Sequence, residues 1–176
     1  MEKKLDIFNQ NGEKTGESET YNNVHLYGLL HRTVHVWFVN SKKEFLLQKR
    51  ANSEHAYSNC WDISAAGHIN SGETSLQAAI RETKEELGIN LPDSVFKFLT
   101  TIKRPIVNHS NIFIDNEFND IYLVHCDFAI SEFKLQIGEV EKVRWINKKE
   151  FKKWIKGEGE TLVSHMEEYQ KLFEYN

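Results

Sequence analysis

Cysteine, proline and long apolar runs are scarce in this chain of 176 residues. Its two cysteines, Cys60 and Cys126, cannot build a disulfide framework, so we expect a reducing, cytosolic location. Its two prolines leave no proline-rich linker, which favours a single domain over residues 1–176. No apolar run approaches the roughly 20 residues that span a bilayer. The opening MEKKLDIF lacks the apolar core of a signal peptide. We therefore expect no membrane contact.

The chain also lacks an excess of positive charge. Its 22 Lys and Arg residues stand against 26 Asp and Glu residues, which gives a net charge of -4 at pH 7. Binding to a nucleic-acid polymer depends on clustered Lys and Arg, so DNA or RNA is not expected as the main partner. A small phosphorylated ligand is compatible with this charge if a metal ion neutralises it. The hydrophobic share of 40% is sufficient for a packed core and excludes a disordered chain.

Hydrophobic periodicity predicts many short strands and few helices. In the segment 31–40, apolar residues alternate with His35 and Trp37, as in a strand. The polar stretch 13–23 is expected to be a loop. Many strands around one strong helix predict an α+β fold with a mixed β-sheet between α-helices. We predict strands at 4–8, 31–40, 44–50, 61–67, 95–103, 120–128 and 140–146, and helices at 73–87, 147–155 and 160–174.

The helix predicted at 73–87 concentrates carboxylates on one side. Glu82, Glu85 and Glu86 are spaced i, i+3 and i+4, so they share one helix face. Like charges at this spacing cost roughly 0.2–0.5 kcal/mol per pair. Such a face is most often solvated, but a divalent cation such as Mg²⁺, which prefers carboxylate oxygens, would also remove the repulsion. Arg81 precedes Glu85 by one helical turn and is expected to orient it.

The segment 67–89, GHINSGETSLQAAIRETKEELGI, resembles the Nudix box. Thr83 departs from the motif, because the family usually has an aliphatic residue there. The resemblance implies the Nudix fold and the hydrolysis, dependent on Mg²⁺ or Mn²⁺, of a diphosphate linked to another moiety. The positions that match the motif are Gly67, Glu73, Arg81, Glu82, Glu85, Glu86, Gly88 and Ile89.

Site roles follow from this resemblance, residue by residue. The metal ligands would be Glu82, Glu85, Glu86 and the carbonyl group of Gly67. Arg81 and Glu73 would hold these ligands in place. Bound metal ions would clamp phosphate oxygens and lower the pKa of an attacking water.

The general base and the substrate contacts lie partly outside the box. Candidates for the base are a box glutamate, Glu139 and Glu141, the last two in the segment IGEVEKVRWI. We count Glu139 with Glu82, Glu85 and Arg81 among the catalytic residues. Arg50, at the end of a predicted strand, suits a substrate phosphate through its planar guanidinium, and a surface salt bridge is the equal alternative. His68 is assigned with Arg50 to substrate binding.

Outside the box the chain resembles one branch of the family. The segments HLYGLLHRTVHVWFVN, LLQKR and WDISAAGH are similar to hydrolases related to isopentenyl-diphosphate isomerase, over roughly residues 3–155. In the isomerases a catalytic cysteine directly precedes the box glycine, whereas here that position is Ala66. Because alanine cannot transfer a proton, isomerisation is the alternative function, and hydrolysis is favoured.

Three histidines match positions that bind a metal in those isomerases: His25, His31 and His68. Glu117 and Asp120 are near the acidic positions but are not in register with them. A second metal site and ordinary hydrogen-bonded histidines both stay open here.

The other aromatic and apolar residues are more simply explained by packing. Trp37, Trp61 and Tyr57 are expected in the core, with stacking on a ligand ring as the alternative. The apolar stripe at 160–174 predicts a helix docked on the domain, with a homodimer contact as the second interpretation. We expect substrate specificity to depend on the loops at 13–23, 51–60 and 104–119.

Overall fold

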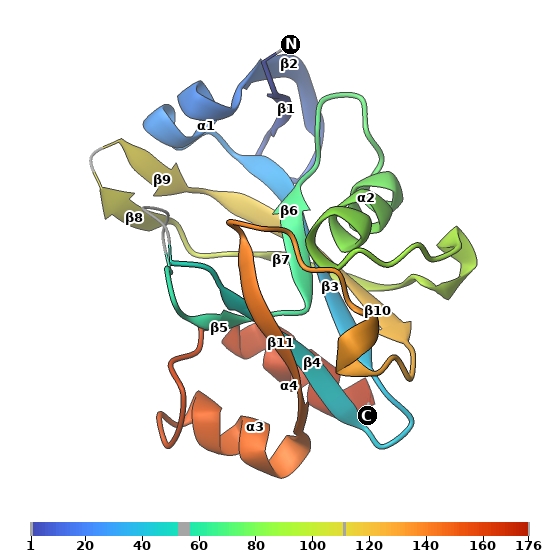
Figure 1. Ribbon diagram of the computed structural model, residues 1–176. Coiled ribbons are helices and arrows are strands. Elements are labelled where there is room, and N and C mark those ends of the chain that lie inside the picture. The colour runs from blue at the N-terminus through green and yellow to red at the C-terminus, as the bar shows by residue number, and fades with distance from the viewer. Residues whose placement is uncertain (1, 53–56, 111, 176) are drawn as a thin grey trace.

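A mixed β-sheet forms the centre of the molecule. The computed structural model describes residues 2–52, 57–110 and 112–175, and the main sheet has the order β11-β4-β3-β10-β7 (Figure 1). The central strands β3 and β10 are parallel, and the other neighbours on this path are antiparallel. These strands are β3 (His31–Val39), β4 (Glu44–Arg50), β7 (Lys97–Lys103), β10 (Glu117–His125) and β11 (Val140–Asn147).

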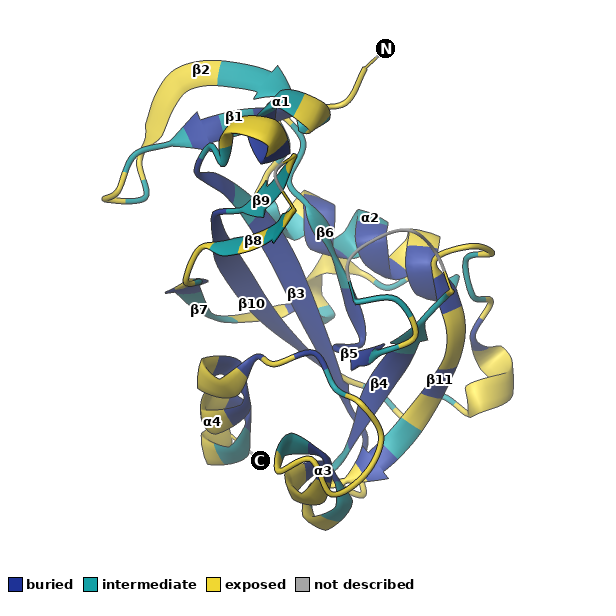
Figure 2. Ribbon diagram, turned by 90° about the vertical axis from the view of Figure 1, so that its left-hand side faces the viewer, coloured by how far each residue is buried: buried dark blue, intermediate teal, exposed yellow. Residues whose placement is uncertain are grey.

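Helices cover both faces of this sheet. Val34, Val36 and Phe38 pack against the helix α2 (Ser75–Leu87). Trp37 and Val39 point to the opposite face and pack with residues of α3 (Lys148–Ile155) and α4 (Met166–Tyr175). Figure 2 shows the buried strands between these helices. The predicted α+β fold, with a mixed sheet between helices, is confirmed.

The helix α2 carries its own start and stop signals. Thr74 is the N-cap, and its hydroxyl and the Gln77 side chain form a reciprocal capping box. Gly88 ends the helix at φ 68°, a left-handed conformation that favours glycine. The helix predicted at 73–87 is therefore present, but it begins two residues later because Thr74 caps it from outside.

The strand predicted at 61–67 is two strands. The segment first pairs with β4 as β5 (Trp61–Asp62) and then with β3 as β6 (Ala65–His68). Between them, the Ser64 hydroxyl donates to the Leu46 carbonyl at 2.6 Å and accepts the Phe38 N–H at 2.9 Å. The segment thus crosses from one strand to the other where β3 and β4 diverge, so Asp62 and Gly67 lie on different partners.

The prediction of a loop at 13–23 was wrong. Residues Lys14–Thr20 form β2, which pairs with β1 (Lys4–Phe8), and α1 (Tyr21–Tyr27) follows directly. The strand β2 is mostly exposed and polar, so it has no apolar alternation to reveal it. Thr20 caps α1 by accepting the Asn23 N–H.

The C-terminal helix is shorter than predicted. It begins at Met166 rather than near 160, because the preceding segment pairs by its backbone with β5. Tyr169 and Leu172 bury its apolar face, at roughly 1.5–3 kcal/mol for a fully buried large side chain. Among the described residues, no helix combines the length and hydrophobicity that crossing a membrane requires. The remaining short elements are η1 (Asp93–Val95), β8 (Val107–Ser110), β9 (Phe113–Asp115) and η2 (Ile130–Glu132).

Candidate active site

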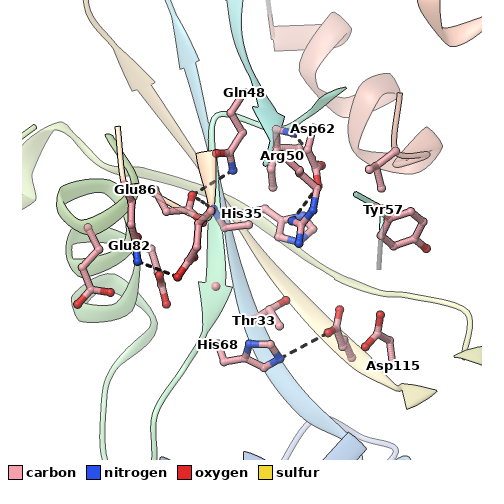
Figure 3. A pocket seen from close by; sticks show the side chains of 18 of the residues that line it. Thr33, His35, Gln48, Arg50, Tyr57, Asp62, His68, Glu82, Glu86 and Asp115 are labelled. Atoms are coloured by element: carbon pink, nitrogen blue, oxygen red, sulfur yellow. Dashed lines mark hydrogen bonds and ion pairs between the residues drawn. The ribbon is translucent and has the colours of Figure 1, made fainter. Parts of the chain in front are cut away.

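The carboxylates of α2 line a cleft of about 400 Å³ (Figure 3). Glu82, Glu85 and Glu86, here called the box cluster, all line it, and so do Gly67 and Glu139. Glu82 and Glu86 are buried, whereas Glu85 is exposed. The structure therefore brings together the residues that the sequence assigns to metal binding and to the base.

Arg81 ties the box cluster to the loop before the helix. Its guanidinium donates to Glu82 at 2.6 Å and to Glu85 at 3.1 Å. It also donates to Glu73 at 2.9 Å and to the His68 carbonyl at 2.9 Å. The hydrogen bonds to Glu73 and the charge of Glu82 raise the pKa of Arg81. Arg81 and Glu73 thus make the contacts predicted for residues that position carboxylates.

The box cluster fits a divalent cation. Burial raises the pKa of Glu82, and burial together with the charge of Glu82 raises the pKa of Glu86 well above its ordinary value. The Ala66 N–H and the Gln48 amide each donate to Glu86 at 3.1 Å, which fixes its carboxylate at the cleft. Two buried carboxylates side by side need a proton or a cation, and oxygen ligands of this kind suit Mg²⁺ or Mn²⁺.

Gly67 is required by the close approach of Glu82. A Cβ atom at position 67 would lie 2.0 Å from Glu82 Oε1, closer than any real contact. The backbone of β6 and the carboxylate of α2 therefore face each other directly. This places the Gly67 peptide beside the box cluster, as the assignment of its carbonyl as a ligand requires.

A second group of side chains that could hold a metal ion lies beside the same cleft, which His68 and Glu117 line. His25, His31, His68 and Glu117, here called the histidine cluster, each offer one atom, and these atoms lie within 4.8 Å of one another. The Nε2 atoms of His25 and His68 are 3.2 Å apart. Glu117 Oε1 lies 3.5 Å from His31 Nε2 and 4.0 Å from His68 Nε2. The three histidines for which the sequence left a second metal site open are thus neighbours.

The ring orientations in the histidine cluster fit a metal ion. The Nδ1–H groups of His25 and His31 donate to the carbonyls of Tyr21 and Leu29, at 2.9 Å each. The Nε2 lone pairs then point inward, the arrangement seen in histidine metal ligands. Among the described residues, the buried Nε2 of His31 has no hydrogen-bond partner.

Electrostatics in the histidine cluster agree with this fit. Burial and the neighbouring His31 hold the pKa of His68 well below its ordinary value, so its imidazole is neutral. Burial opposes the charge of Glu117, but the adjacent His31 outweighs it and keeps the pKa of Glu117 low. A neutral His68 imidazole beside an ionised Glu117 carboxylate is a combination of protonation states that metal binding needs.

The acidic residues near the histidine cluster are partly different from those expected. Glu117 belongs to it, but Asp120 does not, because Asp120 accepts hydrogen bonds from Arg32 at 3.2 Å and Thr101 at 2.6 Å. Asp115, which sequence reasoning missed, lies 3.6 Å from His25 Nε2. The spacing of Asp115 and Glu117 was the available signal, because alternate residues of an extended chain share one side.

The cleft has a third polar region, built around the C-terminal segment. His165 Nε2 donates to Asp62 at 2.9 Å. Glu168 accepts from His35 at 2.8 Å and from the Trp37 indole at 3.1 Å. Burial opposes ionisation of Asp62 and Glu168, but His165 and His35 outweigh it and lower both pKa values to about 2. His165 carried no sequence signal, and the pairing of the preceding segment with β5 together with the docking of α4 brings it here.

Cationic and aromatic side chains complete the cleft. Arg50 lines it and lies 3.5 Å from Asp62, so it is a cleft residue as well as an ion-pair partner. Arg104, which sequence reasoning missed, also lines the cleft, and its side chain has no ion pair with any described residue. Tyr57 lines the cleft and is only partly buried, so its assignment to the core was wrong. Trp37 and Trp61 lie in the core, as predicted.

Positions relative to the cleft distinguish the two candidate bases, Glu139 and Glu141, and bear on the isomerase alternative. Glu139 lines the cleft, whereas Glu141 pairs with Lys49 at 3.2 Å and lies outside the cleft lining. Ala66 lies at the cleft wall beside Glu86, so no thiol stands at that point. Cys60 is not among the residues that line the cleft.

Comparison with known proteins identifies the family. The NUDIX domain model matches residues 29–164. Nudix hydrolase 3 of Arabidopsis thaliana is 39% identical over 98% of this chain, which spans 23% of that protein. An uncharacterized Nudix hydrolase of Listeria monocytogenes is 34% identical, over 89% of this chain and 86% of that protein. An isopentenyl-diphosphate Delta-isomerase of Shigella flexneri is also 34% identical, over 79% of this chain and 74% of that protein, which agrees with the predicted branch.

Solved structures share the fold. DR0079 from Deinococcus radiodurans superposes with a TM-score of 0.73 at 19% identity, covering 97% of this chain and 98% of that one. The NUDIX domain of Shewanella oneidensis NrtR, solved with ADP ribose, superposes with a TM-score of 0.61 at 17% identity, covering 82% and 86%. Nudix hydrolases generally use divalent metal ions. The chain belongs to the Nudix hydrolase family, whose members act on phosphorus-containing anhydrides.

Proposed function

We propose that this protein is a Mg²⁺- or Mn²⁺-dependent pyrophosphohydrolase that cleaves the diphosphate of a nucleoside diphosphate derivative or a related small metabolite. The observation that carries the proposal is the box cluster, in which buried Glu82 and Glu86 face a cleft that also holds Arg50. Buried carboxylates alone would repel a diphosphate. With a divalent cation between them, the same cleft attracts it.

The residues divide the work of hydrolysis. Bound metal would polarise the phosphoryl oxygens and lower the pKa of the attacking water. Glu82, Glu85, Glu86 and the Gly67 carbonyl would hold it, and Arg81 keeps two of these carboxylates in place through its hydrogen bonds.

Proton transfer and anion binding fall to residues across the cleft. Glu139 lines the cleft, and we assign it the role of general base. Arg50 would neutralise a diphosphate oxygen through its planar guanidinium.

The histidine cluster is proposed as a second metal site. The inward-facing Nε2 atoms support it. So does the buried Nε2 of His31, which has no hydrogen-bond partner among the described residues. His68 would then act on the substrate through a bound ion rather than directly. This cluster also favours the second candidate function, isomerisation of a C5 diphosphate, whereas Ala66 argues against it because alanine has no proton to transfer.

A hydrolysis screen with Mg²⁺ and with Mn²⁺ tests the proposal. The panel contains nucleoside diphosphates, sugar nucleotides, ADP-ribose, coenzyme diphosphates, thiamine-type diphosphates and isoprenyl diphosphates. We expect release of phosphate or a nucleotide from at least one compound and none after chelation. Inactivity of folded protein across the panel contradicts the proposal. Deuterium incorporation from solvent into isopentenyl diphosphate, without loss of phosphate, would favour isomerisation.

The cellular location of the protein and its partners are also proposals. A cytosolic location is supported by the two free cysteines, Cys60 and Cys126. The partner we propose is a small-molecule diphosphate. A homodimer stays the second interpretation of the C-terminal helix, and sedimentation velocity would decide it.

A further inference from the structure

The C-terminal segment reaches the cleft by pairing with β5. The Trp61 N–H donates to the Thr161 carbonyl at 2.8 Å, and the Val163 N–H donates to the Trp61 carbonyl at 2.8 Å. This short parallel pairing brings His165 behind Asp62, where the residue is only 7% exposed and still lines the cleft. A residue from the last part of the chain is thereby part of the cleft wall.

His165, Asp62 and Arg50 form a chain of contacts toward the centre of the cleft. His165 Nε2 and the Ile63 N–H both donate to Asp62 Oδ1, at 2.9 Å and 2.8 Å. The other oxygen, Oδ2, lies 3.5 Å from Arg50 Nη1. One carboxylate oxygen is therefore fully used by His165 and the backbone, and the other faces Arg50.

The length of the Arg50 contact matters for its function. At 3.5 Å the ion pair is looser than the 2.7–2.9 Å of a good charge-assisted hydrogen bond. Arg50 is thus directed by Asp62 but is still available to an anion in the cleft (Figure 3).

Loss of His165 would change how strongly Asp62 attracts Arg50. A buried carboxylate that loses a hydrogen-bond donor is attracted more strongly to a remaining cation. Asp62 would then draw Arg50 into a closer pair and away from the cleft. The His165 side chain therefore controls how much of the Arg50 charge is available to a ligand.

We infer that His165 is a positioning residue for diphosphate binding, which holds Asp62 and thereby sets the Arg50 guanidinium toward the cleft. The inference rests on the proposed function, because it takes a diphosphate as the anion that Arg50 meets. It also makes the C-terminal segment a part of the substrate-binding wall, beyond its role as a docked helix.

Calorimetric titration with methylenediphosphonate in the presence of Mg²⁺ tests the inference without turnover. This compound keeps the charges of a diphosphate but has no cleavable bridge. We expect His165→Leu to weaken its binding about tenfold, since one charge-assisted hydrogen bond is lost. His165→Gln keeps a donor near the Nε2 position and is expected to stay within about twofold of the wild type.

A double-mutant cycle separates positioning from general damage. In an Arg50→Gln background, His165→Leu should change the dissociation constant by less than about twofold, because the residue through which it acts is gone. Tyr169→Phe is the matched control. The Tyr169 hydroxyl donates to the Val163 carbonyl of the same segment but does not touch Asp62, so binding should be unchanged even if the melting temperature falls.

The outcomes distinguish the two proposals. Wild-type protein that is folded and does not bind the Mg²⁺–methylenediphosphonate pair contradicts the proposed function together with this inference. Wild-type binding that His165→Leu leaves unaltered, or a loss of equal size in the Arg50→Gln background, overturns this inference alone.

Discussion

The box cluster and the histidine cluster are two candidate metal sites built in opposite ways. Glu82, Glu85 and Glu86 come from one helix, and their spacing alone places them on one face. His25, His31, His68 and Glu117 come from four elements: α1, β3, β6 and β10. The first set is acidic and partly exposed, and the second is mostly imidazole and buried. Local geometry therefore suffices for one site, whereas the other depends on the sheet.

The largest effect is expected from the box cluster. Glu86→Gln removes a buried carboxylate charge that faces the cleft, so kcat should fall by roughly 10²- to 10³-fold. Steady-state rates at saturating Mg²⁺ measure this on whichever substrate the screen identifies.

Glu141→Gln is the matched control, because Glu141 pairs with Lys49 outside the cleft lining. An unchanged rate for Glu86→Gln would contradict the assignment of this residue to the active site.

The next effect concerns the backbone that faces the box cluster. Gly67→Ala would place a Cβ atom 2.0 Å from Glu82 Oε1, and displacing a catalytic group by about 1 Å can cost roughly 100-fold in rate. The same substitution in a Glu82→Ala background should add little, because the clashing carboxylate is absent. A full additional loss there would show that the damage does not pass through Glu82.

A smaller effect, on metal affinity, is expected from the histidine cluster. His31→Leu removes an inward-facing ligand, so the affinity of that site for Mn²⁺ should fall at least about tenfold. Equilibrium dialysis with Mn²⁺ should give one bound ion fewer than the wild type, while the box cluster keeps its own.

Substitutions in the two clusters are expected to remove different bound ions. If Glu86→Gln and His31→Leu remove the same bound ion, the two clusters are one site. His125→Leu, at an exposed histidine, is the matched control for the loss of an imidazole.

The smallest effect is on stability and depends on pH. Burial opposes the charge of Glu168, but His35 and His165 lower its pKa to about 2. Because this pKa is below the unfolded value, the stabilisation is present in full above about pH 5 and is lost as the pH falls toward 2. Glu168→Gln should therefore cost about 3 kcal/mol at pH 7 and roughly half of that at pH 3.

Urea unfolding at the two pH values measures this difference. Glu167→Gln is the control, because Glu167 is exposed on the same helix turn. A cost for Glu168→Gln that does not change with pH would show that the histidine pairs are not its source. The pairing of Glu168 with His35 and His165 is thus expected to contribute to stability.

Helices and apolar strands were predictable, and polar or split elements were not. The capped, amphipathic α2 was expected within two residues of its observed start. The strand β2 was missed because its side chains are exposed and polar, and backbone pairing with β1 alone holds it. The extended residues before Met166 fall within the helix predicted at 160–174, because an apolar pair such as Leu162 and Val163 fits either structure.

Site prediction followed the same division. The three glutamates lie together as their helical spacing predicts, and Glu139 and Gly67, the latter implied by the Nudix resemblance, line the same cleft. Arg81 donates to two of these glutamates. Asp115, Arg104 and His165 were missed, because no local pattern connects them with the box. Their positions depend on the β8–β9 hairpin, on the end of β7 and on the docking of α4.

The sequence alone determined the net charge of -4 and the three glutamates on one helix face. Helical periodicity places residues three and four apart on the same side, so the box cluster needed no tertiary information. The histidine cluster and the chain from His165 to Arg50 were decided only by the tertiary structure. The histidine cluster depends on the register of β3 with β10, and the chain from His165 depends on a late segment that pairs with β5. These contacts join residues far apart in the chain.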